Sequence, residues 1–215
     1  MVDKARVRRS YDALASTFDE HRSAEGRGTE ILASFLEDLD PGSRILDVGC
    51  GTGVPILASL AANHAAIGLD IAGEPIRLAQ ERVPAAELLQ GDMVSLPIAT
   101  DACDAVVAFW SLIHVPLAEH QPALEEFARI IRPGGRALLC EGTDAWTGEN
   151  PNWLDTDVPM EWNIAGAEKT AVQLQTAGFE ITDRWGAPEE LTPSDESTVA
   201  EAHPWTFFAA ILKRE

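Results

Sequence analysis

The sequence predicts an α/β protein with a mostly parallel sheet that is covered by helices on both faces. Short apolar segments rich in Val, Ile, Leu and Ala alternate along the chain with segments of helical periodicity. The apolar segments are hydrophobic throughout, as expected of strands that are buried on both faces. A glycine-rich turn joins the first of these strands to the next helix. Together these observations indicate repeated strand–helix–strand units.

Two amphipathic helices are predicted ahead of the first strand. Apolar side chains recur at helical spacing over residues 3–20 and again over residues 28–39, where the pattern stops at a Pro-Gly pair. We therefore expect residues 1–42 to form an N-terminal helical cap and residues 43–215 to form the main domain.

The main domain alternates strands with helices. Strands are predicted at residues 44–48, 65–70, 86–92, 103–110 and 136–142, and helices at residues 55–63, 74–83, 117–131 and 165–178. Two further strands, at residues 179–185 and 205–214, have no helix between them, so one of them should run antiparallel. Residues 142–163 are polar and contain three tryptophans and two prolines. They are expected to form a long loop on the substrate side, since loops of this length are commonly functional.

Composition bounds the class of protein. The chain has 215 residues, of which 46% are hydrophobic, enough for a core without disulfides. The three cysteines, Cys50, Cys103 and Cys140, are too scattered for a disulfide framework or a zinc site. There is no apolar run of membrane-spanning length, and residues 1–16 lack the apolar region of a secretory signal, so neither a membrane span nor such a signal is expected. We expect a reduced, cytoplasmic protein.

The net charge of −19 disfavours a polyanionic partner, so no nucleic acid is expected to bind. No membrane partner is expected either, because no apolar run is long enough to span a membrane. The basic cluster of Lys4, Arg6, Arg8 and Arg9 is interpreted as a solvated helix face. The excess of acidic residues also fits life in high salt, where self-repulsion is screened. A melting temperature that does not rise in molar salt would contradict that hypothesis. A monomer or a homodimer is expected.

The glycine-rich turn carries the first chemical signal. Gly49, Gly51 and Gly53 follow a strand and precede a helix, with Asp47 near the end of the strand. Glycines permit unusual φ values and a close approach of the backbone to a ligand. A dinucleotide site needs the spacing G-x-G-x-x-G, and a carboxylate beside a pyrophosphate is unfavourable. The pattern favours a cationic ligand that carries an amino group or a sulfonium; the alternative is a tight turn without a ligand.

The segment ILDVGCGTG resembles motif I of the class I S-adenosylmethionine-dependent methyltransferases, and the order and spacing of later motifs extend the resemblance over residues 43–141. It implies a Rossmann-like, seven-stranded sheet with an antiparallel last strand. It also implies S-adenosylmethionine as the methyl donor, S-adenosylhomocysteine as the product and a small-molecule nucleophile as the acceptor. Two alternatives are a protein that binds this cofactor without methyl transfer and an enzyme of another class on the same fold.

The resemblance also implies a cofactor site. Asp47 would hold the amino group, Asp70 would accept from the ribose hydroxyls, and Asp92 would accept from the adenine amine. Asp70 could instead cap the next helix, and Met93 could be a core residue. The residues expected to bind the cofactor are Asp47, Gly49, Cys50, Gly51, Gly53, Asp70, Ile71, Asp92, Met93 and Phe109.

The catalytic candidates are His114 and Tyr11. His114 follows the fourth strand, and its ordinary pKa of about 6.5 suits proton removal at neutral pH; the alternative is a packing residue. Tyr11 lies in a segment that resembles the Y-D-x-x-A helix of small-molecule methyltransferases, or it makes only an apolar contact. Trp110, Glu141 and Trp146 are expected to bind the substrate.

Four tryptophans fall in predicted loops near the transfer face: Trp110, Trp146, Trp153 and Trp162. Aromatic walls suit an apolar or flat acceptor, or a cationic one through cation–π contact. Alternatively, two or three of them belong to the core. His120 is expected on the surface of its helix. Since no helix carries His or carboxylate pairs at metal-ligand spacing, no metal site is expected.

Overall fold

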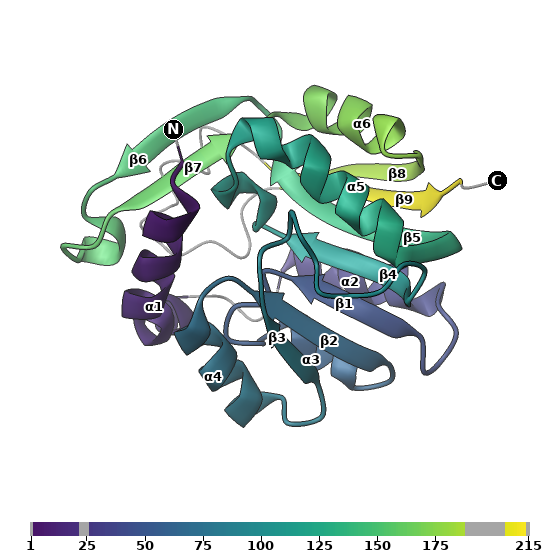
Figure 1. Cartoon of the computed structure of the whole chain (residues 1–215), viewed down its shortest axis with the longest axis horizontal. Helices are drawn as coiled ribbons and strands as arrows, with labels where there is room; N and C mark the ends of the chain where they lie inside the picture. The colour runs from purple at the N-terminus through teal and green to yellow at the C-terminus, as the bar shows by residue number, and fades with distance from the viewer. Residues whose placement is uncertain (1, 22–25, 188–204, 214–215) are drawn as a thin grey trace.

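The computed structural model of the chain describes residues 2–21, 26–187 and 205–213. The strands of its main sheet are β1 (Arg44–Val48), β2 (Ala65–Asp70), β3 (Glu87–Gln90), β4 (Cys103–Phe109), β5 (Ile131–Gly142), β8 (Phe179–Ala187) and β9 (Trp205–Leu212). They lie in the order β3-β2-β1-β4-β5-β9-β8 (Figure 1). Strand β9 pairs antiparallel with β5 and β8, and the remaining pairings are parallel. The predicted α/β class, the seven strands and the antiparallel last strand are confirmed.

Helices cover both faces of the sheet (Figure 1). They are α1 (Lys4–His21), α2 (Arg27–Glu37), α3 (Ile56–Ala61), α4 (Gly73–Arg82), α5 (His120–Ile130) and α6 (Ala167–Thr176). Ile45 of β1 belongs to the core cluster that contains Leu32 of α2 and Leu57 of α3. The next residue, Leu46, belongs to the second cluster, with Phe127 of α5, because successive side chains of a strand point to opposite faces. No helix in the described ranges has the length and apolar character needed to cross a membrane.

The parallel register brings four strand ends to one edge of the sheet. Val48 of β1 pairs with Leu69 of β2, and Asp70 pairs with Gln90 of β3. The loops that follow β1, β2, β3 and β4 therefore leave the sheet on the same side, where open α/β sheets bind ligands. Helix α1 contacts α4 and the hairpin described next, so it lies across this edge (Figure 1).

The predicted loop at residues 142–163 is wrong, because most of this segment is a β-hairpin. Strand β6 (Trp146–Asn150) pairs antiparallel with β7 (Met160–Ile164) in a separate two-stranded sheet. A short 3₁₀ turn, Trp153–Asp155, lies between them. Every residue of β7 is buried, including polar Glu161 and Asn163. The polar composition predicted a loop. The prediction failed because the Glu161 carboxylate of β7 finds its hydrogen-bond partners in Asp3 and Arg6, which are distant in sequence.

His120 is fully buried, so the expected surface position is wrong. Its Nε2 lies 3.0 Å from the main-chain oxygen of Val115. Helix α5 starts at His120, which places this residue on the same stripe as Leu124 and Phe127. The spacing of His120, Leu124 and Phe127 therefore explains the burial, and it could have been read from the sequence.

Candidate active site

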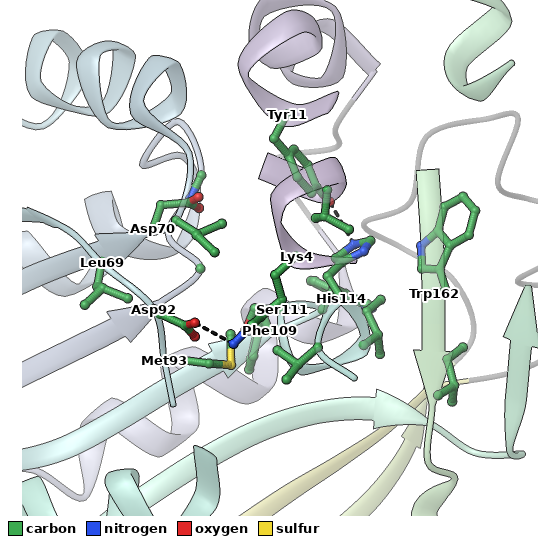
Figure 2. A pocket seen from close by; sticks show the side chains of 18 of the residues that line it. Lys4, Tyr11, Leu69, Asp70, Asp92, Met93, Phe109, Ser111, His114 and Trp162 are labelled. Carbon is green, nitrogen blue, oxygen red and sulfur yellow. Dashed lines mark hydrogen bonds and ion pairs between the residues drawn. The ribbon is translucent and has the colours of Figure 1, made fainter. Parts of the chain in front are cut away.

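A cavity lies at the carboxyl edge of the sheet, between the loops after β1 to β4, helix α1 and the β6–β7 hairpin. Figure 2 shows Asp70, Asp92 and Met93 on one side of it and Trp162 on the other, with His114 next to Trp162. The predicted site residues that line it are Tyr11, Gly49, Gly51, Asp70, Ile71, Asp92, Met93, Phe109, Trp110, His114 and Trp146. Among the predicted residues, Asp47, Cys50, Gly53 and Glu141 lie outside the lining.

The glycine turn is shaped by its own neighbours as well as by the cavity. Gly49, Gly51 and Gly53 all have positive φ values, of 76°, 55° and 85°, which favour glycine. A Cβ on Gly49 would lie 2.3 Å from the Cβ of Ser111, and one on Gly53 would lie 3.0 Å from a methyl of Val83. Only Gly49 and Gly51 border the cavity. Gly53 is therefore required for the close packing of the turn against Val83, and not for contact with the cavity.

The carboxylate of Asp70 is held at the end of β2 by the backbone. Its Oδ2 accepts the N–H of Gly51 and its Oδ1 accepts the N–H of Ala72, both at 2.9 Å. Burial raises the pKa of this carboxyl, although the backbone hydrogen bonds oppose that effect. Each carboxylate oxygen retains capacity for a further hydrogen bond. A ligand with two neighbouring hydroxyls can therefore bind to Asp70, which lines the cavity.

Asp92 is engaged by the N-terminal helix. Lys4 of α1 places its Nζ 2.5 Å from Oδ2 of Asp92 and also forms an ion pair with Glu119. Burial lowers the pKa of the Lys4 ammonium, but the hydrogen bonds to the two carboxylates raise it on balance. The other oxygen of Asp92 accepts the N–H of Val94 at 3.1 Å.

The interpretation of the basic cluster as a solvated helix face is therefore wrong for two of its members. Lys4 lines the cavity, and Arg6 forms ion pairs with Glu161 and Glu149 of the hairpin. Only Arg8 and Arg9 are exposed. Lys4 and Arg6 are turned to the cavity and to the hairpin, whereas Arg8 and Arg9 are turned to solvent, and the charges alone do not show this difference.

Tyr11 and His114 form a hydrogen-bonded pair. The Oη of Tyr11 lies 2.9 Å from Nε2 of His114, and Nδ1 of His114 lies 2.9 Å from the main-chain oxygen of Glu161. Because a carbonyl oxygen can only accept, Nδ1 carries the proton and Nε2 accepts from the tyrosine hydroxyl. Removal of the ring from water lowers the pKa of His114 to about 4. The pair is thus uncharged at neutral pH.

The tryptophans divide between the cavity and the core. Trp110, Trp146 and Trp162 line the cavity, whereas Trp153 is 1% exposed and packs against Tyr11. Trp110 has a φ of 51°, a conformation that costs about 1–3 kcal/mol for a residue with a side chain. Trp205 also lines the cavity, and sequence reasoning missed it. The signal was available, since the first residue of an antiparallel last strand must lie at the carboxyl edge.

Glu141 is buried behind the cavity. It is 0% exposed, and its Oε1 accepts the N–H groups of Gly142 and Ala165 at 3.3 Å. Burial raises the pKa of this carboxyl to about 8. Glu141 is not among the described residues that line the cavity, so its contact with substrate stays a prediction. Gly142, the last residue of β5, pairs with Trp205 of the cavity lining, but the side chain of Glu141 is buried inside the protein.

Residues 45–135 match the family described as a methyltransferase domain. Residues 45–135 thus carry a methyltransferase domain. Within that match lie the glycine turn, Asp70, Asp92 and His114, whereas helix α1 and the β6–β7 hairpin lie outside it. The lining of the cavity fits the family's cofactor, because Asp70 and Asp92 can accept from hydroxyl and amino groups at its sheet edge.

Relatives of the methyltransferase domain carry different names. A tRNA (carboxymethyluridine(34)-5-O)-methyltransferase of Arabidopsis thaliana is 32% identical over 168 residues, which are 78% of this chain and 38% of that protein. The biotin biosynthesis bifunctional protein BioHC of Cellvibrio japonicus is 36% identical over 141 residues, 64% of this chain and 27% of that protein. This chain thus spans less than two fifths of either relative.

Solved structures share the fold. The [4+2]-cyclase SpnF has a TM-score of 0.75 at 22% identity, over 97% of this chain and 96% of that one. A geranyl diphosphate C-methyltransferase of Streptomyces coelicolor, solved with S-adenosyl-L-homocysteine, has a TM-score of 0.66 at 15% identity, over 86% of this chain and 74% of that one. At these identities the likeness supports the Rossmann-like architecture of the domain alone.

Proposed function

We propose that this chain is a methyltransferase that passes the methyl group of S-adenosylmethionine to an O, N or C nucleophile of a small molecule held in the cavity. The proposal rests on one observation: hydrogen-bond acceptors suited to the cofactor and a pair of side chains able to move a proton lie in the same cavity. Acidic acceptors at the sheet edge, Asp70 and Asp92, line the same space as the Tyr11–His114 pair. When bound, the cofactor supplies a methyl group on a positively charged sulfur, so the protein mainly provides alignment and exclusion of water.

The cofactor would lie along the glycine turn and the ends of β2 and β3. Asp70 would accept from the ribose hydroxyls, since both of its oxygens are already oriented by the backbone. Asp92 would accept from the adenine amine beside Met93, which borders the cavity and packs against the core below it. The backbone of Gly49 and Gly51 would support the remainder. Asp47, buried at 2% exposure in β1, would act through a water or through the turn.

The Tyr11–His114 pair would remove the proton of the acceptor. The hydroxyl of Tyr11 donates to Nε2 of His114, so its oxygen can receive a proton from a ligand while its own proton moves to the imidazole. The main-chain oxygen of Glu161 holds Nδ1–H and keeps Nε2 available. The low pKa of His114, about 4, makes it a weak base, which suits an acidic hydroxyl more than an unactivated alcohol.

The Arabidopsis relative is named as a tRNA methyltransferase, which favours an RNA acceptor. That name disagrees with the expectation that the acceptor is a small molecule and that no nucleic acid binds. Two observations favour the small molecule. The net charge is −19, and RNA binding depends on cations that neutralise phosphates. In the described part of the chain, Lys4 is the cation that lines the cavity, and it is paired with Asp92 and Glu119.

Calorimetry with S-adenosylmethionine tests the cofactor site. Asp70→Asn removes an acceptor and should weaken binding about 10- to 100-fold, because hydrogen bonds to a charged group contribute about 1.5–3 kcal/mol. Asp183→Asn, at an exposed position on β8, is the matched control and should bind normally. Equal affinities of Asp70→Asn and the unmodified chain would contradict the proposed site.

Methyl transfer is tested separately with a radiolabelled methyl donor. The acceptors are a mixture of low-molecular-mass metabolites and, in a parallel reaction, total tRNA. Label in the metabolite fraction is the expected result. Label confined to tRNA would establish the RNA function instead, and cofactor binding without label in either fraction would favour a binding protein.

A further inference from the structure

Five aromatic residues form one end of the cavity, which we call the tryptophan chamber. They come from two parts of the structure, the carboxyl edge of the main sheet and the β6–β7 hairpin. Phe109, Trp110 and Trp205 stand at the sheet edge, and Trp146 and Trp162 stand on the hairpin; all five line the cavity. Within the sheet-edge group the rings of Trp110 and Trp205 meet edge to face, with centroids 6.1 Å apart. Within the hairpin group the rings of Trp146 and Trp162 are 6.0 Å apart.

The hairpin side of the chamber lies away from the charged side chains of the cavity. The charged side chains among the described lining residues are Lys4, Asp70 and Asp92. Figure 2 shows Asp70 and Asp92 on the side opposite Trp162, and Lys4 of α1 between them and Trp162, beside Phe109. Between the two sides lies the Tyr11–His114 pair, with the His114 ring 6.0 Å from that of Trp162. A ligand on the hairpin side of the chamber therefore meets aromatic surface and an uncharged pair rather than an ion.

Two hydrogen-bond donors of the chamber lack a partner. The indole Nε1 atoms of Trp110 and Trp205 are buried and make no hydrogen bond within the part of the chain that the structure describes. Ser111, next to Trp110, has its Oγ in the same state. Buried donors are nearly always satisfied, and an indole N–H can only donate. The missing partner is therefore an acceptor atom, such as an oxygen.

The donors also bear on the charge of the ligand. Indole N–H groups carry a partial positive charge, which disfavours a cation beside them. A free carboxylate or phosphate would be desolvated here without a cationic side chain, which is costly. An uncharged oxygen, such as that of a ketone, a lactone or an ether, satisfies the donors without that cost.

We propose that the tryptophan chamber binds the methyl acceptor, and that this acceptor is an uncharged planar molecule whose carbonyl or ether oxygen receives hydrogen bonds from Trp110 and Trp205. This inference rests on the proposed function, since it names the substrate class of the same site. The molecule lies between the sheet-edge group and the hairpin group of aromatic rings. Its reactive hydroxyl or carbon faces the Tyr11–His114 pair.

The test uses three probes that differ in one property each. Chromone is planar, uncharged and carries a ring carbonyl; naphthalene lacks the oxygen; chromone-2-carboxylate adds a charge. Binding to the full chain with S-adenosylhomocysteine present is measured by quenching of tryptophan fluorescence. Chromone should bind at least fivefold more tightly than either of the other probes.

Variants assign the effect to the chamber. Trp205→Phe keeps the ring and removes the N–H, so it should weaken chromone binding about fivefold, the worth of one neutral hydrogen bond, and leave naphthalene unchanged. Trp110→Phe should do the same. Trp185→Phe on β8, outside the cavity lining, is the control, and thermal unfolding confirms that each variant is folded.

The outcomes separate this inference from the proposed function. Tighter binding of chromone-2-carboxylate, or an unchanged ratio of chromone to naphthalene affinity in both Phe variants, overturns the substrate class. Binding of a tRNA anticodon stem-loop with none of the three probes overturns it in favour of RNA. In each case, unimpaired binding of S-adenosylmethionine shows that the proposed cofactor site stands, whereas loss of that binding would overturn the proposed function itself.

Discussion

The Tyr11–His114 pair is the part of the site where single atoms decide the chemistry. His114 was selected from sequence for its ordinary pKa, but its surroundings lower the pKa to about 4. The ring keeps its Nε2 free to accept because Glu161 holds Nδ1–H through a main-chain oxygen. The tyrosine hydroxyl, and not the imidazole alone, is therefore the group that we expect to contact the acceptor.

Tyr11→Phe tests this assignment. The variant retains the ring, which packs against Trp153 and Phe18, and loses only the hydroxyl. We expect kcat to fall about 100-fold, in the lower range for loss of a general base, with little change in the affinity for S-adenosylmethionine. Steady-state kinetics and calorimetry give the two quantities, and an unchanged kcat would remove Tyr11 from the reaction.

The pH dependence of kcat/KM tests His114. A lowered pKa means that the imidazole remains neutral, and able to accept a proton, until the pH falls to about 4. The acid limb of the profile should therefore lie near pH 4 and not near the ordinary value of about 6.5. A limb at pH 6 to 7 in the unmodified enzyme would mean that the imidazole is exposed to water during turnover.

Glu141 makes stability depend on pH. Its pKa is about 8 in the folded protein, against an ordinary value of 4.5. Below pH 4.5 the carboxyl is protonated in both states and costs nothing. Above that pH the unfolded state ionises first, so stability is lost progressively up to about pH 8, by roughly 1.4 kcal/mol per pH unit.

Glu141→Gln should remove this loss, since the amide keeps an oxygen for Gly142 and Ala165. The melting temperature of the variant should exceed that of the unmodified chain by more at pH 8 than at pH 5. Turnover should be little changed, because the side chain lies outside the cavity lining. A strong rise in the KM of the acceptor would instead restore the predicted contact with substrate.

At the scale of elements, helix α1 connects the two sides of the site. Asp12 accepts the N–H of Glu74 at the start of α4, and Asp19 binds the hydroxyl of Thr52 at 2.6 Å. On the other side, Arg6 pairs with Glu161 of the hairpin. The same helix presents Tyr11 to the cavity. Its position is therefore set by contacts with both the cofactor end and the acceptor end.

Lys4 of this helix occupies an oxygen of Asp92 that the adenine amine would use. Lys4→Met should release that oxygen and remove a positive charge near a cationic ligand, so the affinity for S-adenosylmethionine should rise about three- to tenfold. Arg9→Met, at an exposed position of the same helix, is the control. Calorimetry in low salt measures the affinity of each variant for S-adenosylmethionine. A loss of affinity in Lys4→Met would show that the lysine supports the cofactor and does not compete with it.

The β6–β7 hairpin shows why one element was predicted incorrectly. Its sequence is polar and contains two prolines, features of a loop. In the structure Glu161 is 7% exposed, and its carboxylate accepts from the N–H of Asp3 and from Arg6. Partners at the N-terminal end of the described chain, Asp3 and Arg6, lie more than 150 positions away in sequence and allow this polar segment to form a buried strand. Prediction of secondary structure from neighbouring residues cannot include such distant partners.

At the scale of the whole molecule, the charge and the cavity point to the same kind of acceptor. A net charge of −19 repels polyanions over long range, while the tryptophan chamber offers a small ligand an uncharged aromatic surface. The relatives known as tRNA methyltransferases are more than twice as long as this chain. The comparison therefore bears on the domain and leaves room for a different acceptor here.

The sequence by itself determined the order of strands and helices of the main sheet and the positions of Gly49, Gly51, Asp70 and Asp92 at one edge of it. It could do so because apolar periodicity marks each strand and parallel strands end on the same side. Only the tertiary structure decided that Lys4 reaches Asp92, that Glu141 turns inward and that Trp205 joins the cavity. Those outcomes depend on how segments far apart in the chain pack together, and a side chain's direction at the end of a strand is set by neighbours that the local sequence does not name.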